Sequence, residues 1–304
     1  MKNFINISDL SKNELRAIID GAKKRKSERG KKPNSQPDSD QPIQGKTMIM
    51  FFAKPSTRTR ISFDIAIKQL GGSTITLNPE GIHYGKGDES LKDTAKVLSE
   101  YADIIMIRTS KHKNLEEFSK YSTIPLINGL SDLSHPCQVI SDILTFEEHK
   151  GDISGKKLAW IGDGNNNMSN SFIEASVKFN FKLNIGCPKN YGPSKSVLNW
   201  VKKNKKKIYI FHSAEKASQN ADVIFTDKVV SLNDKVNKKQ KLLRFNKFKV
   251  TKKLMSYTNK DCIFLHCLPR GSEVSEEVFL GKKSHVWQQA LNRVHVQKSI
   301  LLYC

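Results

Sequence analysis

The fold is indicated most directly by residues 47–72, TMIMFFAKPSTRTRISFDIAIKQLGG. The apolar run at 47–52 is typical of a buried strand. Residues 61–70 have the apolar spacing of a helix, and the two glycines at 71–72 are a common stop signal after one. The stretch therefore predicts a strand that passes through a short polar turn into a helix.

The polar turn, KPSTRTR at 54–60, carries three hydroxyl groups and two guanidinium groups at the predicted helix N-terminus. Free backbone N–H groups and the positive end of the helix dipole favour an anion at such a position. Short hydroxyl donors and the planar arginine fork also match phosphate oxygens. The turn predicts a phosphate pocket, and the alternative is a solvated helix cap with ordinary surface arginines.

The alternation of strand and helix extends in both directions from this stretch. An opening helix is expected over 8–29, with Ser8 as its N-cap. Further strands are expected at 73–77, 103–108, 124–128, 157–162, 182–187, 208–211, 223–226 and 262–266. Further helices are expected at 90–101, 114–121, 136–149, 167–179, 193–204 and 285–302. Such alternation predicts parallel, doubly wound sheets of the α/β class.

The long helix at 136–149 separates two α/β sets of similar size. We therefore expect two doubly wound parallel-sheet domains joined by that helix, the first at 1–134 and the second at 135–284. Ligands of such sheets bind beyond the carboxyl ends of the strands. The polar candidates at those ends are Ser56–Arg60, Arg108, His135, Asn167, Asp227 and His266–Arg270.

Composition argues against several other classes of protein. The chain has 304 residues, of which 38% are hydrophobic, and it contains no apolar run long enough to predict a membrane span. Its N-terminus lacks the apolar core of a signal peptide. The five scattered cysteines form no Cys-x-x-Cys pair, which favours reduced thiols over zinc or a disulfide framework. We expect a cytoplasmic protein without a membrane partner.

The formal net charge of +21 raises the question of nucleic-acid binding. The densest basic runs, at 23–26 and 202–207, have no interleaved aromatic residues and match no nucleic-acid module. A solvated basic surface that attracts anionic substrates is therefore the favoured interpretation, and no nucleic-acid partner is expected.

Five motifs, in order along the chain, resemble those of the aspartate/ornithine carbamoyltransferase family. They are STRTR at 56–60, Arg108 at the end of a strand, HPCQ at 135–138, HCLPR at 266–270 and NRVHVQK at 292–298. The cysteine-containing fourth motif resembles the ornithine branch in particular. The resemblance spans nearly the whole chain.

The resemblance implies transfer of the carbamoyl group from carbamoyl phosphate to the δ-amine of L-ornithine, giving L-citrulline and phosphate. It implies no metal and no cofactor, because carbamoyl phosphate is already activated. It implies a carbamoyl-phosphate-binding domain at 1–134, completed by a C-terminal helix at 285–304 that packs back on it, and an ornithine-binding domain at 135–284. A homotrimer, or a multiple of trimers, is expected.

The resemblance also assigns roles toward carbamoyl phosphate. The residues that would hold the phosphate are Ser56, Thr57, Arg58, Thr59 and, from a loop offered to the neighbouring subunit, His83. Arg108 and His135, with Thr59, would donate to the carbonyl oxygen, where negative charge grows in the transition state. The groups that would orient the carbamoyl NH₂ or close over the reacting atoms are Gln138, the backbone at Cys267 and Leu268, and Arg293.

Toward ornithine, the resemblance assigns Asn167 to the amino-acid carboxylate and Asp227 to an ammonium group. Ser231 and the Leu232 backbone would complete that site. The δ-amine has a pKa of about 10 and must lose a proton before attack, a step near which we expect Asp227 and Cys267. The expected catalytic set is Arg58, Arg108, His135, Asp227 and Cys267.

Alternatives concern the amine acceptor. The substrate loop reads Ser231-Leu232-Asn233, where the ornithine branch usually has Ser-Met-Gly, so the glycine's flexibility is lost. A carbamoyltransferase for putrescine, an acylated ornithine or aspartate is therefore the second hypothesis. A basic nucleic-acid-binding protein is a distant third.

Overall fold

The computed structural model describes residues 2–78, 89–230 and 237–304. The chain divides into two compact units, the first made of residues 1–144 and 290–304 and the second of residues 145–289. Each unit has its own parallel sheet with helices between the strands, as the sequence predicts. The chain passes between the units within α5 (Pro136–Lys150) and again within α12 (Val286–Tyr303).

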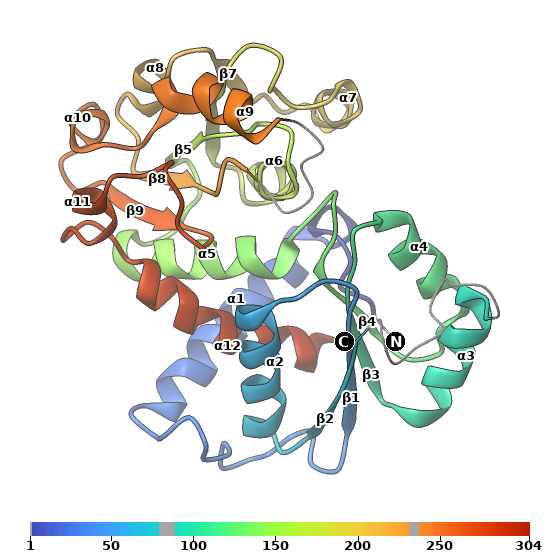
Figure 1. Ribbon diagram of the computed structural model, residues 1–304. Helices are drawn as coiled ribbons and strands as arrows, with labels where there is room; N and C mark the ends of the chain where they lie inside the picture. The colour runs from blue at the N-terminus through green and yellow to red at the C-terminus, as the bar shows by residue number, and fades with distance from the viewer. Residues whose placement is uncertain (1, 79–88, 231–236) are drawn as a thin grey trace. The chain divides into compact units, whose positions relative to one another are not determined.

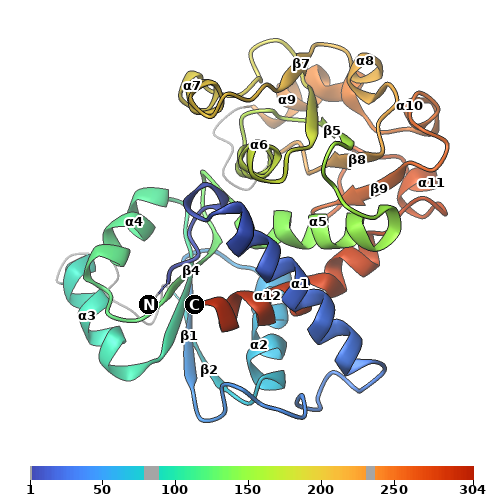
Figure 2. The same cartoon turned by 180° about the vertical axis from the view of Figure 1, so that it is seen from behind.

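Among its described residues, the first unit has one parallel sheet with strand order β2-β1-β3-β4. The strands are β1 (Thr47–Phe52), β2 (Ser73–Leu77), β3 (Ile104–Arg108) and β4 (Leu126–Leu130). The helices are η1 (Ile7–Asp9), α1 (Lys12–Arg29), α2 (Thr57–Gln69), α3 (Leu91–Tyr101) and α4 (His112–Tyr121). Figures 1 and 2 show α3 and α4 on one face of this sheet and α1, α2 and α12 on the other.

The covered sheet explains why its central strands are apolar throughout. Side chains of a strand alternate between the two faces, so a strand with helices on both faces buries every residue. In β1, Met48 to Phe52 are all buried. Ile49 and Phe51 pack with Ile105 and with Phe118 of α4 in one apolar cluster.

The opening helix begins later than the sequence analysis predicts. Ser8 lies in the short 3-10 helix η1, and α1 starts at Lys12 with Ser11 as its N-cap. The Ser11 side chain accepts from the Glu14 N–H, and the Glu14 carboxylate accepts from the Ser11 N–H at 2.9 Å. This capping box satisfies two N-terminal groups at once and fixes the start of the helix.

A buried ion-pair cluster ties the loop after α1 to the C-terminal helix. Lys298 of α12 is fully buried, and its Nζ lies 2.8 Å from Oδ2 of Asp38. Arg29 of α1 lies 2.7 Å from the other oxygen of the same carboxylate. Burial lowers the pKa of Lys298, and the hydrogen bonds to Asp38 oppose that effect. Such charges are tolerated in a core because each has a close partner.

The second unit's described residues form a parallel sheet with strand order β7-β6-β5-β8-β9. The strands are β5 (Lys157–Ile161), β6 (Lys182–Gly186), β7 (Tyr209–Phe211), β8 (Val223–Thr226) and β9 (Ile263–His266). The helices are α6 (Asn167–Phe179), α7 (Lys195–Lys203), α8 (Ala214–Ser218), α9 (Lys238–Phe245), η3 (Asn246–Phe248), α10 (Lys252–Met255) and α11 (Glu276–Phe279). The sequence analysis did not predict α8 to α11.

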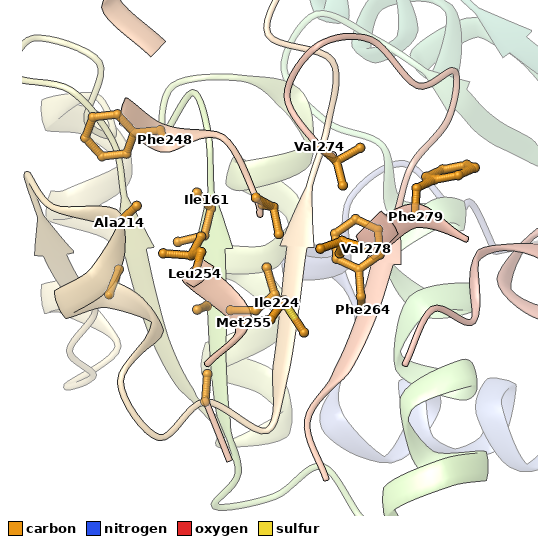
Figure 3. Packing of buried hydrophobic residues seen from close by; sticks show 14 of the residues in the cluster. Ile161, Ala214, Ile224, Phe248, Leu254, Met255, Phe264, Val274, Val278 and Phe279 are labelled. Carbon is orange, nitrogen blue, oxygen red and sulfur yellow. The ribbon is translucent and has the colours of Figure 1, made fainter. Parts of the chain in front are cut away.

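These short helices supply one layer of the second core. Figure 3 shows Leu254 and Met255 beside Ile161 and Ile224 of the sheet, and Phe264 belongs to the same buried cluster. Another aromatic contact is made by Phe172 of α6, which packs against Trp160 and Phe225 with ring centroids 5.7 and 4.4 Å away. The described part of the chain contains no helix that is both long and apolar enough to span a membrane.

Candidate active site

The predicted phosphate turn lies where β1 leads into α2, as the sequence analysis expects. Ser56 is the N-cap residue of α2, and within the described chain its side chain makes no capping hydrogen bond. The first turn, from Thr57 onward, contains no acidic residue. Thr57 and Arg58 are exposed, while Thr59 is buried. The backbone N–H groups and exposed side chains of this turn are therefore suited to bind an anion.

Arg108 lies at the carboxyl end of β3, next to an irregularity in the sheet. Ile107 pairs with Asn128, but Arg108 pairs with Leu130, so Gly129 is skipped. Such a bulge turns the following side chain relative to the regular pleat. A Cβ on Gly129 would lie 2.2 Å from Sδ of Met106, so this position accepts glycine but not a larger residue without a shift.

His135 immediately precedes α5 and is held by a compact polar turn. Ser131 N–H donates to the Ser134 carbonyl at 2.9 Å, and Ser134 N–H donates to the Ser131 hydroxyl at 3.1 Å. The Asn128 amide, from β4, donates to the Ser134 hydroxyl at 2.9 Å. Because these groups satisfy one another, the turn can place the imidazole of His135 at a fixed point.

The pKa of His135 is lowered by its burial and by three nearby arginines. Burial lowers its pKa well below the ordinary value, and the positive charges of Arg293, Arg108 and Arg58 lower it further. The imidazole is therefore neutral at pH 7, with one nitrogen carrying a proton and the other a lone pair. A neutral histidine among guanidinium groups can donate a hydrogen bond from its protonated nitrogen without taking up a further proton.

Arg293 of α12 joins three helices of the first unit. Its Nη2 donates to Oγ1 of Thr59 at 2.8 Å, and its Nη1 donates to Oε1 of Gln138 at 3.0 Å. Nε2 of Gln138 in turn donates to Oδ1 of Asp142 at 2.7 Å. All four side chains are buried. Three of them were predicted as site residues, and the structure brings these three together.

Asp142 is the member of this network that the sequence analysis missed. Its signal was present, because Asp142 follows Gln138 by four residues, a spacing that places two side chains side by side on a helix. An aspartate in the middle of an apolar helix pattern is also unusual without a partner. A buried carboxylate at such a position indicates a specific hydrogen bond, whereas a carboxylate on a solvated helix face would need none.

In the second unit, the predicted residues lie at the carboxyl ends of the strands. Asn167 begins α6, whose N-cap Asn166 accepts the Ser169 N–H at 2.8 Å. Thr226 pairs with His266 in neighbouring strands, so Asp227 and Cys267 leave the sheet from adjacent strand ends. Oδ1 of Asp227 accepts from the Lys228 N–H at 2.7 Å. Cys267 is half-buried.

The loop after β9 is held by His266, the first residue of the HCLPR motif. Leu268 N–H donates to Nδ1 of His266 at 2.8 Å, and Nε2 of His266 lies 2.8 Å from Oε1 of Glu273. Burial raises the pKa of Glu273, but the hydrogen bonds from His266 and Gly271 outweigh it, and the net pKa is lowered. The backbone at Cys267 and Leu268 is thereby fixed at the strand end.

The loop after β5 is tied to α9 by a partly shielded ion pair. Oδ2 of Asp163 lies 2.8 Å from Nζ of Lys241, and its Oδ1 accepts from the Asn165 N–H at 3.0 Å. The Lys241 ammonium also lies 5.8 Å from the ring centre of Tyr191. One carboxylate thus fixes the approach to Asn166 and Asn167 and anchors α9.

Three predicted site residues, His83, Ser231 and Leu232, lie outside the described residues. Within the described residues, no group of three or more histidine, cysteine, aspartate or glutamate side chains could hold a metal ion. The described candidates of the first unit are hydroxyl, guanidinium, imidazole and amide groups, and those of the second unit are amide, carboxylate and thiol groups.

Arginines, hydroxyls and a neutral imidazole gathered at the carboxyl end of a parallel sheet are typical of a transferase that acts on a phosphorylated donor. Comparison with known proteins identifies the family to which this chain belongs. Residues 2–148 match the domain described as aspartate/ornithine carbamoyltransferase, carbamoyl-P binding domain, and residues 154–304 match the Asp/Orn binding domain. The chain belongs to the aspartate/ornithine carbamoyltransferase family.

Full-length relatives support the same assignment. An ornithine carbamoyltransferase of Rhodopseudomonas palustris is 45% identical over 100% of this chain and 96% of its own length. One from Agrobacterium fabrum is 42% identical over 100% and 97%. Among solved structures, ornithine carbamoyltransferase from Pyrococcus furiosus has a TM-score of 0.91 at 38% identity, covering 99% of this chain and 96% of that one. The anabolic enzyme from Campylobacter jejuni has a TM-score of 0.91 at 38% identity, covering 100% and 99%.

Proposed function

We propose that the protein transfers the carbamoyl group of carbamoyl phosphate to the δ-amine of L-ornithine, giving L-citrulline and phosphate, in the biosynthetic direction that leads to arginine. The observation that carries the proposal is the contact of Arg293 with both Thr59 and Gln138, close to a neutral His135. The full-length similarity to ornithine carbamoyltransferases supports it.

In the first half of the reaction, the donor is bound and polarised. Ser56, Thr57, Arg58 and Thr59 hold the phosphate as leaving group, helped by the free N–H groups of the first turn of α2. Thr59 accepts a hydrogen bond from Arg293, so its own hydroxyl proton is directed to another acceptor. With Arg108 and His135 it donates to the carbonyl oxygen, where negative charge develops.

In the second half, the amine is bound and deprotonated. Asn167 holds the carboxylate of the amino acid, and Asp227 pairs with an ammonium group. Asp227 and Cys267 leave adjacent strands, which supports a shared role near the δ-amine as it loses its proton. Ser231 and the backbone of Leu232 complete this proposed subsite.

The remaining expectations belong to the same proposal. Residues 1–134 with 285–304 would bind carbamoyl phosphate, and residues 135–284 would bind ornithine. The protein would act in the cytoplasm as a homotrimer or a multiple of trimers, with His83 reaching the phosphate of a neighbouring subunit. The residues that orient the carbamoyl NH₂ would be Gln138, Cys267 and Leu268.

A different amine acceptor is the second candidate, and a sequence observation favours it. The acceptor loop has Ser231-Leu232-Asn233 in place of the usual Ser-Met-Gly of the ornithine branch. Asparagine lacks the backbone freedom of the glycine that the ornithine branch usually has there. Putrescine, acylated ornithine and aspartate are the acceptors to compare.

The test is a colorimetric assay for carbamoylated product with purified protein, carbamoyl phosphate and each amine in turn. We expect citrulline from L-ornithine, with a kcat/KM at least ten times higher than for any other acceptor. A higher kcat/KM for another amine would show that this amine, and not L-ornithine, is the preferred acceptor. No product from any amine at saturating substrate would refute the proposed function.

A further inference from the structure

The side chain of Asp142 is fully buried on α5, one helical turn after Gln138. Its Oδ1 accepts a hydrogen bond of 2.7 Å from Nε2 of Gln138. A carboxylate in an apolar helix face costs free energy unless a specific bond offsets it. The hydrogen bond to Gln138 is therefore a specific contact that offsets the cost of burying this carboxylate.

The two partners of Gln138 dictate which way its amide faces. A carboxylate accepts hydrogen bonds, so it must receive the NH₂ end of the amide. A guanidinium group is purely a donor, so Arg293 must meet the carbonyl end, which it does at 3.0 Å. The amide of Gln138 is consequently fixed in one of its two orientations, with its carbonyl on the Arg293 side.

The orientation matters because the two ends of the carbamoyl group have opposite hydrogen-bonding character. The carbonyl oxygen accepts, whereas the NH₂ donates. With its carbonyl on the Arg293 side, Gln138 has a second lone pair that can receive the NH₂. If the amide of Gln138 were reversed, its NH₂ would face Arg293 and the carbamoyl NH₂. Each of these two contacts would then place one hydrogen-bond donor against another.

We propose that Asp142 is a positioning residue that holds Gln138 as an acceptor and so makes the site selective for the amino end of the carbamoyl group. The proposal rests on the proposed function, because it takes carbamoyl phosphate as the donor. It adds a residue that touches no substrate atom and acts through the Gln138 amide. It also gives the buried charge a specific use.

The experiment compares two donors that differ at one position. Acetyl phosphate carries a methyl group where carbamoyl phosphate carries the NH₂, and both carry the same phosphate and carbonyl. In Asp142→Asn, the residue at 142 can donate as well as accept, so it no longer selects the orientation of the Gln138 amide and only Arg293 does. We expect Kd for carbamoyl phosphate to rise about tenfold, as for loss of one neutral hydrogen bond, with Kd for acetyl phosphate and inorganic phosphate within twofold.

Calorimetric titration of the full chain without ornithine measures these constants. Ser141→Ala is the matched control, because Ser141 is equally buried on the same turn and bonds the Cys137 carbonyl at 2.8 Å. It should leave the affinities for both donors unchanged. If Asp142→Asn does not fold, Asp142→Ser serves instead, since it also removes the charge without adding volume.

Two outcomes would overturn the proposal. Equal weakening of carbamoyl phosphate and acetyl phosphate would show that Asp142 supports the fold of the site and no more. Unchanged affinity for both would show that Gln138 needs no help to face the donor. Binding of carbamoyl phosphate by the wild-type chain is measured without an amine, so failure to form citrulline remains a separate result.

Discussion

At the scale of single residues, the first unit gathers positive charge around a histidine that stays neutral. Arg58, Arg108 and Arg293 all lower the pKa of His135. The same guanidinium groups would stabilise the negative charges of a bound phosphate and of a developing oxyanion. The residues of KPSTRTR thus differ in their surroundings: Thr59 belongs to the buried network, whereas Arg58 is exposed to solvent.

Arg58→Gly is expected to lower kcat by roughly 10²- to 10³-fold, the usual cost of removing one donor to a transition-state charge. Arg60→Gly is the matched control, because Arg60 is exposed on the same turn and lies outside the proposed contacts. Both variants lose similar helix propensity, so their melting temperatures should fall alike. Arg58→Gly with near-normal activity would refute the proposed role of Arg58.

At the scale of elements, periodic patterns in the sequence were sufficient for most of the sheet strands and longer helices. They failed between residues 227 and 262, where α9 and α10 are short and rich in lysine. Those helices are held by contacts with residues distant in sequence, such as Lys241 with Asp163, which a local pattern does not contain. Tertiary packing, not propensity, decides such segments.

The positions of Arg108, at the end of β3, and of His135, just before α5, were predictable from local patterns, whereas their roles in a site stay predictions. The contacts that surround them were not predictable from such patterns. The bulge at Gly129 arises from the pairing of two strands, and the network of Asp142 and Gln138 is completed by Arg293 of α12. Neither arrangement can be predicted from a local stretch of sequence, because each depends on residues that are distant in the chain.

Gly129→Ala is expected to misplace Arg108 and to destabilise the first unit. The new Cβ would lie 2.2 Å from Sδ of Met106, and such overpacking costs about 1–3 kcal/mol. We expect kcat to fall at least about tenfold, since a small misplacement of a catalytic group is costly. Gly192→Ala, where a Cβ meets no atom closer than 4.0 Å, is the control. Equal kinetics of the two variants would contradict the assigned role of the bulge.

At the scale of the whole molecule, buried histidines make stability depend on pH. Burial lowers the pKa of His112, of His135 and of His285 below the ordinary value of 6.5. A folded state that binds these protons more weakly than the unfolded state loses stability as the pH falls below about 6.5. Above that pH the contribution is fully present.

The melting temperature is therefore expected to fall between pH 7 and pH 5, before the exposed carboxylates titrate. His135 contributes to that loss, because burial holds its pKa in the folded state well below the ordinary value. His135→Gln replaces the imidazole with an amide that does not titrate, so its melting temperature should fall less over this range. A flat wild-type profile, or an equal fall in the variant, would contradict the expectation.

Because residues 290–304 belong to the first unit, the order of synthesis matters. The ribosome makes Asp38 and Thr59 early, but their partners Lys298 and Arg293 emerge after the entire second unit. A nascent chain that has not reached these residues has Asp38 with Arg29 but without Lys298, and Thr59 without Arg293. The network around Thr59 and Gln138 is therefore completed only after residues 145–289 have been synthesised.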